Sequence, residues 1–196
     1  MRMPVLTDEN PAVDQLLESC RQGDRDAFAT LFETYRDRVY SIALVFFKGD
    51  AAAAGDITQQ VFLKLMSRMS QFENRADFST WLYRLVTNTC LDRHRSLRRW
   101  VFFGTAEEAD SAGPVRSGRS AEEEYSQRQL SEVVHSAIAE LKPKFRMAIL
   151  LKYFDDLSYE EMAAVLQVSK GTVASRLNRG HRMLARRLAH LRGTEV

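Results

Sequence analysis

Short polar and basic side chains crowd the C-terminal end of this chain, where they could bind a polyanion. Seven lysine or arginine residues follow Gln167, and a single acid, Glu195, accompanies them. Arginine and lysine neutralise phosphates, whereas serine, threonine and asparagine also donate hydrogen bonds to base edges. The residue types and the one-sided basic excess therefore predict a surface that binds nucleic acid. Its basic members are Lys170, Arg176, Arg179, Arg182, Arg186, Arg187 and Arg192.

Two helices joined by a tight turn are expected to present these side chains. Ser158 precedes an apolar run and Glu161 follows three residues later, which is the spacing of a capping box. The first helix should end near Leu166, because Ser169 offers a second N-cap. Two residue pairs have the spacing of hydrophobic staples at the helix starts, namely Leu157 with Met162 and Val168 with Val173.

The alternative interpretation is a solvated basic helix in an ordinary bundle. Two caps, two staples and the basic excess favour a helix-turn-helix, whose early turns would reach base edges in the major groove while later arginines reach phosphates. Gly171 costs roughly 1 kcal/mol of helix propensity relative to alanine. That cost predicts close approach of the backbone to DNA or to the first helix.

Composition narrows the class of protein. The chain has 196 residues, a hydrophobic content of 45% and a net charge of only +2, unevenly placed. Cys20 and Cys90 lie far apart and outside any metal-like spacing, so no metal or cofactor is expected. With no signal peptide recognised, a reduced cytosolic setting is the default expectation. The longest apolar run, Ile42–Phe47, is too short to span a bilayer, so no membrane insertion is expected.

Helical periodicity dominates and strand alternation is absent, which predicts an all-α protein of two helical domains. Residues 10–97 form the first domain and residues 125–192 form the second. Residues 98–124 form a flexible linker with glycines, a proline and serines between acids. The linker would let the domains pack together or separate. The helices expected in the first domain are Val13–Cys20, Asp26–Phe47, Ala51–Ser70 and Thr80–Leu97.

A second group of residues suited to nucleic acid lies in the first domain. Aromatic rings cluster around the loop Glu73–Asp77, and a run of arginines follows them. Rings can stack on unpaired bases while arginines hold the phosphates. Trp81 falls on an apolar helical face, so it is more often a core residue. The aromatic residues are Phe72, Phe78, Trp81 and Tyr83, and the polar or basic ones are Arg84, Asn88, Arg93, His94, Arg95, Arg98 and Arg99.

Three motifs, in order along the chain, resemble those of a group IV sigma-70 factor, the extracytoplasmic function type. Asp56–Leu65 resembles the family's polymerase-binding helix, and Phe78–Arg95 resembles its promoter-melting helix. Leu141–Gly180 resembles its fourth conserved region. The resemblance covers residues 26–95 and 129–188.

The resemblance implies a bacterial, cytoplasmic transcription initiation factor without enzymatic activity. It implies contacts with promoter DNA, both duplex and melted, with the β′ clamp helices and β flap of core RNA polymerase, and with an anti-sigma factor that can hold it at the inner membrane face. The clamp contacts would be Asp56, Gln59, Gln60 and Phe62. The minus-thirty-five contacts would be Lys170, Thr172, Ser175, Arg176, Asn178 and Arg179. The minus-ten contacts would be Phe72, Asn74, Arg75, Ala76, Asp77, Arg84, Asn88 and Arg95.

Two departures from the family pattern stand out. Gln60 occupies a position where the family usually has an acid, so one ion pair with polymerase is absent. Ala174 stands where the family often has lysine or arginine, which removes one DNA contact. The acidic linker would thread toward the RNA exit channel, where its carboxylates could mimic RNA.

Three other functions compete with this interpretation. A free-standing helix-turn-helix regulator would need neither the clamp-binding helix nor the melting helix. A serine recombinase would need an α/β catalytic domain, for which there is no strand pattern. A metal-dependent nuclease would need grouped carboxylates. The pairs Asp155-Asp156 and Glu160-Glu161 are better interpreted as a turn and a helix start.

Overall fold

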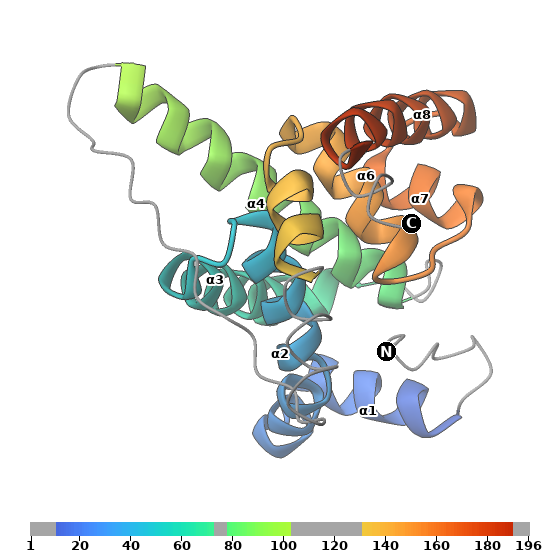
Figure 1. The fold of residues 1–196 in the computed structure, drawn as a ribbon. Coiled ribbons are helices and arrows are strands. Elements are labelled where there is room, and N and C mark those ends of the chain that lie inside the picture. The colour runs from blue at the N-terminus through green and yellow to red at the C-terminus, as the bar shows by residue number, and fades with distance from the viewer. Residues whose placement is uncertain (1–10, 73–77, 103–130, 190–196) are drawn as a thin grey trace, which may run out of the picture.

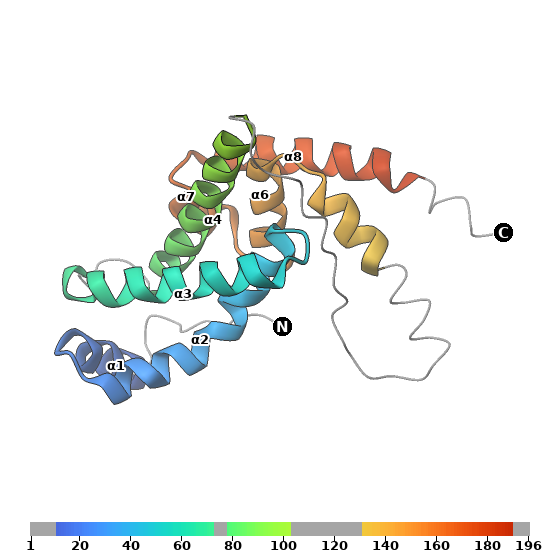
Figure 2. The ribbon, with the colours of Figure 1, turned by 90° about the vertical axis from the view of Figure 1, so that its left-hand side faces the viewer.

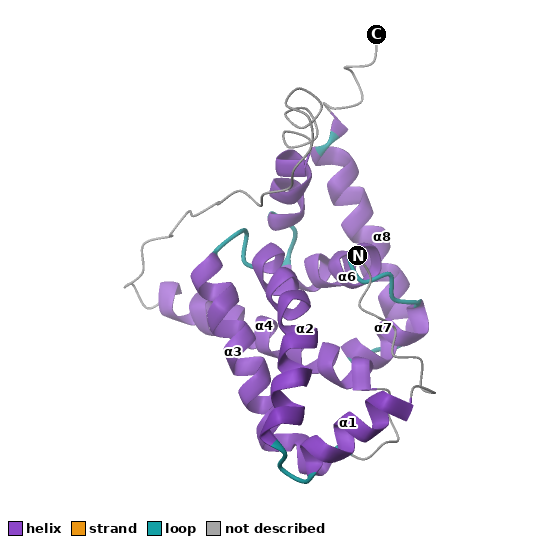
Figure 3. Cartoon of the chain, turned by 90° about the horizontal axis from the view of Figure 1, so that it is seen from below, coloured by secondary structure: helices purple, strands orange, loops and turns teal. Residues whose placement is uncertain are grey.

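A computed structural model describes residues 11–72, 78–102 and 131–189 of the chain (Figure 1). Every regular element in these ranges is helical and none is a strand, which confirms the all-α prediction (Figure 3). Residues 131–139 are also helical. The other helices are α1 (Pro11–Arg21), α2 (Arg25–Phe46), α3 (Ala51–Arg68), the 3-10 turn η1 (Met69–Gln71), α4 (Phe78–Phe102), α6 (Pro143–Tyr153), α7 (Tyr159–Leu166) and α8 (Lys170–Arg187).

In the described ranges, no helix combines the length and the apolarity needed to cross a membrane.

Side-chain caps explain where several of these helices start. Asp24 accepts hydrogen bonds from two backbone amides of α2, and Asp50 accepts one from Ala53 at the start of α3. Gly23 provides the left-handed conformation, with φ of 86°, that turns α1 into α2. α4 continues to Phe102, five residues past the predicted end at Leu97, because no helix breaker occurs before Gly104.

The two cysteines are free and buried, as expected for small core residues. Burial raises the pKa of the Cys90 thiol to about 12. Burial and the charge of Asp24 also raise the pKa of Cys20. Both thiols are therefore protonated at neutral pH and shielded from reagents in solution.

The two domains pack against each other, with α4 between them (Figures 1 and 2). α4 packs on α2 and α3 of its own domain and on α6 and α7 of the C-terminal domain. One continuous set of buried apolar residues extends through both halves of the described chain. This is the packed arrangement that the long linker would allow, and separation of the domains on polymerase stays a prediction.

Asp155, in the turn between α6 and α7, joins the two domains. It is 1% exposed, and its Oδ1 accepts from Arg38 Nε at 2.5 Å and from the Tyr83 hydroxyl at 2.7 Å. Arg38 also donates to the carbonyl of Phe154. Burial raises the pKa of Asp155, although the hydrogen bond from Tyr83 and the charge of Arg38 act in the opposite direction. Residues from α2 and α4 thus bind one carboxyl of the helix-turn-helix.

Arg146, on α6, is a second buried charge at the domain boundary. Its guanidinium donates to the carbonyls of Ile138 at 3.3 Å and Leu141 at 3.1 Å, and also to that of Ala139. It donates across the boundary to the carbonyl of Phe46, the last residue of α2. Cations are favourable at helix C-termini, where carbonyls lack partners. Arg146 therefore caps one helix in each domain.

Gly180 sets how closely α8 approaches α6. A Cβ at this position would lie 3.1 Å from Ile149 Cγ1 and 3.2 Å from Ile149 Cδ1. We expect Gly180→Val to destabilise the protein by about 1–3 kcal/mol, because the added methyl groups overpack this contact. The measurement is thermal unfolding beside Gly171→Val, since only Ser169 Oγ, at 3.9 Å, lies near a Cβ there. Equal melting temperatures for the two variants would contradict the prediction.

Candidate nucleic-acid interface

The helix-turn-helix forms as its sequence predicts. The Ser158 hydroxyl accepts from the Glu161 amide at 3.2 Å, and the Glu161 carboxylate accepts from the Ser158 amide at 2.6 Å. This reciprocal pair is the predicted capping box at the start of α7. Gln167 ends α7 in the left-handed conformation, and Ser169 caps α8 by accepting from the Thr172 amide at 3.2 Å. The turn between α7 and α8 is therefore fixed by local hydrogen bonds.

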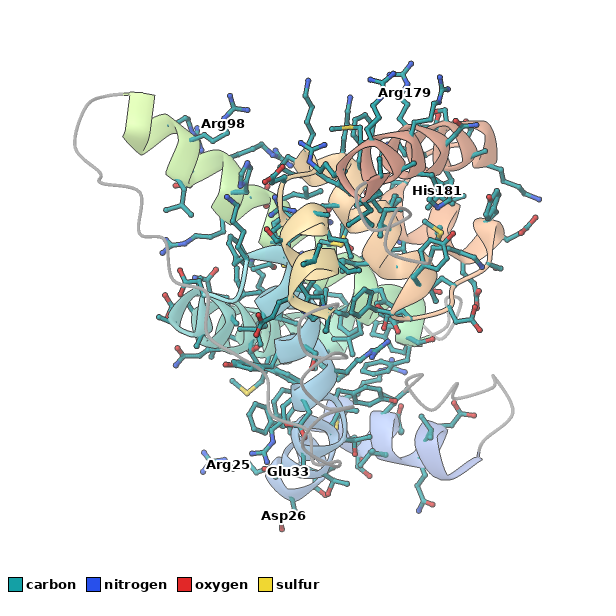
Figure 4. The ribbon with its side chains drawn as sticks, viewed as in Figure 1. Arg25, Asp26, Glu33, Arg98, Arg179 and His181 are labelled. Atoms are coloured by element: carbon teal, nitrogen blue, oxygen red, sulfur yellow. The ribbon has the colours of Figure 1, made fainter. Side chains whose placement is uncertain are left out.

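α8 presents a polar and basic face to solvent. Val173 and Leu177 point inward and are at most 1% exposed. On the other side Arg179 extends away from the molecule (Figure 4). All six residues predicted to read duplex DNA remain accessible. Lys170, Ser175, Asn178 and Arg179 are exposed, and Thr172 and Arg176 are partly exposed.

Several polar residues of this face are held by neighbours on the same or adjacent helix. The Ser169 and Thr172 hydroxyl oxygens lie 3.0 Å apart, and Lys170 donates to Glu160 of α7. Arg182 Nε donates to Asn178 Oδ1 at 2.9 Å. Among the described residues, Arg176 and Arg179 form no ion pair, so their guanidinium groups are available to a ligand.

Gly171 does not approach the first helix closely. The atom nearest to a Cβ built there is Ser169 Oγ, at 3.9 Å. The expectation of close packing on α7 was therefore wrong. Close approach of the backbone to DNA stays a prediction.

α4 carries a second polar stripe. Arg84, Asn88 and Arg95 are four and seven residues apart, so they share one side of the helix. Asn88 and Arg95 are exposed, and Arg84 is partly exposed. Arg95 pairs with Asp92 at 3.2 Å. Arg98 continues the basic character and points outward on the same upper side of the molecule as Arg179 (Figure 4).

The aromatic residues before α4 form a packed cluster. Phe72 stacks on Trp81 with ring centroids 5.0 Å apart and meets the edge of Phe78 at 5.9 Å. Phe72 is only 5% exposed, so its predicted contact with a melted base is not available in this arrangement. Trp81 is partly buried, as its position on an apolar face indicates. The predicted contacts Asn74, Arg75, Ala76 and Asp77 lie outside the described residues.

Tyr83 does not belong to the aromatic cluster where the sequence placed it. It is 3% exposed and its hydroxyl bonds Asp155. Burial and the nearby Asp155 charge raise the pKa of Tyr83, so its hydroxyl stays protonated and donates. Sequence patterns gave no sign of this role, because the two residues are 72 positions apart.

α3 displays a mixed polar and apolar face. Asp56, Gln59 and Gln60 are exposed, as expected of residues that bind a partner. Phe62 is 4% exposed and packs edge-on against Phe32 at 4.7 Å, so it supports the helix from inside. A direct contact from Phe62 to a partner is therefore not available here.

Two residues of α3 that the sequence interpretation overlooked are exposed apolar side chains. Leu63 is 54% exposed and Met66 is 55% exposed. A signal existed, because Ile57, Val61 and Leu65 already account for the buried side of α3. Further large apolar residues on the polar side indicate a surface that another molecule covers.

Comparisons with known proteins assign the two domains. The Sigma-70 region 2 family model matches residues 31–100, and the Sigma-70, region 4 model matches residues 131–184. The chain is 32% identical over 185 residues to the ECF RNA polymerase sigma factor SigW of Bacillus subtilis, covering 91% of this chain and 98% of that one. It is also 32% identical over 170 residues to the ECF RNA polymerase sigma-E factor of Escherichia coli K12, covering 84% and 87%.

Two solved structures share the fold. The sigma factor RpoE of Bartonella quintana, in complex with the anti-sigma factor NepR, matches with a TM-score of 0.67 at 22% identity, covering 83% of this chain and 96% of that one. CnrH, in complex with the cytosolic domain of CnrY, matches with a TM-score of 0.63 at 22% identity, covering 89% and 96%.

The fold and the motifs define the class of protein: a DNA-binding transcription initiation factor made of two helical domains. The chain belongs to the sigma-70 family of RNA polymerase sigma factors, in its extracytoplasmic function group. It is an alternative sigma factor. This assignment rules out the competing interpretation, a free-standing helix-turn-helix regulator.

Proposed function

We propose that α8 reads the minus-thirty-five element of the promoter and that α4 holds the melted minus-ten element. The observation that carries this proposal is the presence of two separate polar and basic faces, one on each domain. A sigma factor of this kind performs no chemistry of its own. It acts in the bacterial cytoplasm, where it directs core RNA polymerase to its promoters.

The face of α8 suits duplex DNA. Its first two turns offer Lys170, Thr172 and Ser175 beside the exposed Gly171, as a recognition helix in a major groove requires. Arg176 and Arg179 are free to form bidentate hydrogen bonds with a guanine or to bind phosphates. Ala174, partly exposed between Val173 and Ser175, contributes only a methyl group to this face.

The stripe on α4 suits a single strand. Arg84 and Arg95 can hold phosphates, and Asn88 between them can hydrogen-bond an extruded base. Phe72 takes no direct part in this proposal, because it is buried against Trp81. Its packing on Phe78 and Trp81 instead holds the end of η1 against α4.

The exposed face of α3 is the proposed contact with the clamp helices of the β′ subunit. Asp56, Gln59 and Gln60 supply polar contacts at its N-terminal half, and Leu63 and Met66 supply apolar ones. Asp56 lies 4.0 Å from Arg93 of α4, an exposed pair that a partner could rearrange at low cost. The C-terminal domain would bind the β flap.

An anti-sigma factor is a further proposed partner. Of the two solved structures described above, one is a sigma factor in complex with the anti-sigma factor NepR, and the other is CnrH in complex with the cytosolic domain of CnrY. A membrane-bound inhibitor would hold this chain at the inner face of the membrane until a signal releases it.

Reconstitution with core RNA polymerase tests the proposal. Co-elution with the core enzyme and run-off transcripts from a pool of genomic fragments would support it and reveal both promoter elements. Tight DNA binding without association with polymerase would overturn it.

Within that assay, we expect Arg179→Ala to weaken promoter binding by about 1–3 kcal/mol if Arg179 reads a base. A phosphate contact would instead weaken binding to all sequences and reduce the salt dependence by about one unit of slope. The control is Arg25→Ala, since Arg25 is equally cationic and exposed but lies at the opposite end of the molecule (Figure 4). Unchanged transcription from every promoter would remove Arg179 from the interface.

A further inference from the structure

We propose that Asp155, Arg38 and Tyr83 form a latch that holds the two DNA-binding domains together in the free protein and opens before both promoter elements are bound. The inference rests on the proposed function, because it concerns how the two DNA-binding surfaces become separated. The domain contact itself is independent of that function and can be measured without polymerase.

The latch is a buried carboxyl whose partners come from the other domain. Among the described residues, the hydrogen bonds to the Asp155 side chain come from Arg38 and Tyr83, both in the N-terminal domain. The second carboxylate oxygen has no hydrogen-bond partner among them. When the domains separate, water can reach both oxygens of Asp155. The carboxyl is therefore compensated by protein only while the domains are in contact.

Arg38, in the N-terminal domain, likewise finds its partners in the opposite domain. Its hydrogen bonds to the described residues cross the boundary, to the Asp155 carboxylate and the Phe154 carbonyl, and its side chain is only 16% exposed. Arg36, two residues earlier on α2, bonds instead to Glu33 and Asp37 within its own domain. Arg38 thus contributes to the contact between the domains, whereas Arg36 forms ion pairs within α2.

A latch of this kind specifies one arrangement and still releases. Removing one partner of a buried ion pair is costly, because the other charge stays buried without compensation. When the domains separate, both charges are exposed to water and regain most of their solvation free energy. The geometry is selective, because a single oxygen must accept from two donors on two different helices. An apolar contact of similar area would tolerate sliding.

The packed arrangement cannot engage both promoter elements. Elements centred at minus ten and minus thirty-five are about 25 base pairs apart, or roughly 85 Å along B-DNA. α8 has 18 residues and is about 27 Å long. α4 packs directly on α7, which in turn packs on α8. The stripe on α4 and the face of α8 are therefore too close together for this spacing.

The chain length permits the required separation. Residues 103–130 connect α4 to the helix at residues 131–139. A chain of this length spans at most about 95 Å when extended. Opening the latch is then the step that converts a closed free protein into one that can bind two distant elements.

The first test measures the distance between the domains in the free, full-length protein. Fluorophores are placed at Ser67→Cys on α3 and Ala185→Cys on α8, both exposed positions. The native Cys20 and Cys90 are buried, so labelling is selective.

We expect a single short distance with a narrow distribution for the parent and for Arg36→Ala, and longer distances with a broader distribution for Arg38→Ala. Asp155→Ala repeats the test from the other domain. Unchanged distances in both latch variants would overturn the proposal.

The second test measures affinity for core polymerase. If the binding-competent state is the open one, a closed equilibrium lowers the apparent affinity by the open fraction. Arg38→Ala should then tighten binding by about tenfold relative to Arg36→Ala. An opened Arg38→Ala protein with unchanged polymerase affinity would contradict the requirement for release. Failure of the parent protein to bind polymerase would overturn the proposed function, while the distance measurement would still decide whether the latch exists.

Discussion

Replacing Leu63 with glutamate is expected to lower the affinity for core RNA polymerase by about tenfold or more, equivalent to about 1.4 kcal/mol. Leu63 is 54% exposed on α3, beside the equally exposed Met66. A charge introduced into an apolar contact would remove its burial energy and would have to be desolvated without a partner. The dissociation constant, measured by fluorescence anisotropy with labelled protein, gives the answer directly.

A matched control separates this effect from a general loss of apolar surface. Leu97 is 41% exposed on α4, a different helix, so Leu97→Glu makes the same chemical change elsewhere in the domain. We expect Leu97→Glu to bind polymerase within twofold of the parent. If Leu63→Glu, and then the double variant with Met66→Glu, also bind within twofold, α3 is not the polymerase contact.

Local signals in the sequence were sufficient for the helix-turn-helix. Ser158 with Glu161, and Ser169, stand where caps are needed, and each forms the hydrogen bond that its spacing predicts. Such signals work because a cap and its amide are at most three residues apart. The periodicity of α2 and α3 likewise placed their buried sides correctly, as the burial of Leu31, Val39 and Ile57 shows.

Long-range contacts are what the sequence could not reveal. Asp155-Asp156 was interpreted as a turn, and Asp156 does adopt a left-handed conformation with φ of 54°. Nothing nearby in the sequence indicates that Asp155 is buried by Arg38, 117 residues away. Phe62 and Phe72 were assigned to partners because they stand in family motifs, but tertiary packing buries both rings. Sequence patterns and motifs therefore identify which helix presents a binding surface more reliably than they identify which of its residues make the contacts.

In the proposed minus-ten region, too, local spacing could be predicted from the sequence and long-range contacts could not. The stripe of Arg84, Asn88 and Arg95 follows from helical spacing alone, and the structure leaves it accessible. Tyr83 is adjacent in sequence but faces the C-terminal domain, since one residue turns a helix by about 100°. The proposed minus-ten stripe and the domain contact therefore lie on neighbouring sides of α4.

A variant of Arg146 should show the largest loss of stability. We expect Arg146→Ala to lower the free energy of unfolding by about 3 kcal/mol, because it leaves several buried carbonyls without donors, each costing about 1–3 kcal/mol before the site relaxes. Arg186→Ala, at an exposed position of α8, removes the same charge and should change stability by less than about 0.5 kcal/mol. Urea unfolding followed by circular dichroism measures both.

Arg146→Lys distinguishes geometry from charge. Burial lowers the pKa of Arg146 to about 10, so the guanidinium remains protonated at neutral pH. A lysine would keep a cation at the ends of the two helices, but a single ammonium cannot match a planar guanidinium that donates to carbonyls in both domains. We therefore expect a stability between those of Arg146→Ala and the parent. If Arg146→Lys matches the parent, the charge at the helix ends is sufficient. If it matches Arg146→Ala, the stability depends on the fork of donors that joins α2 to the C-terminal domain.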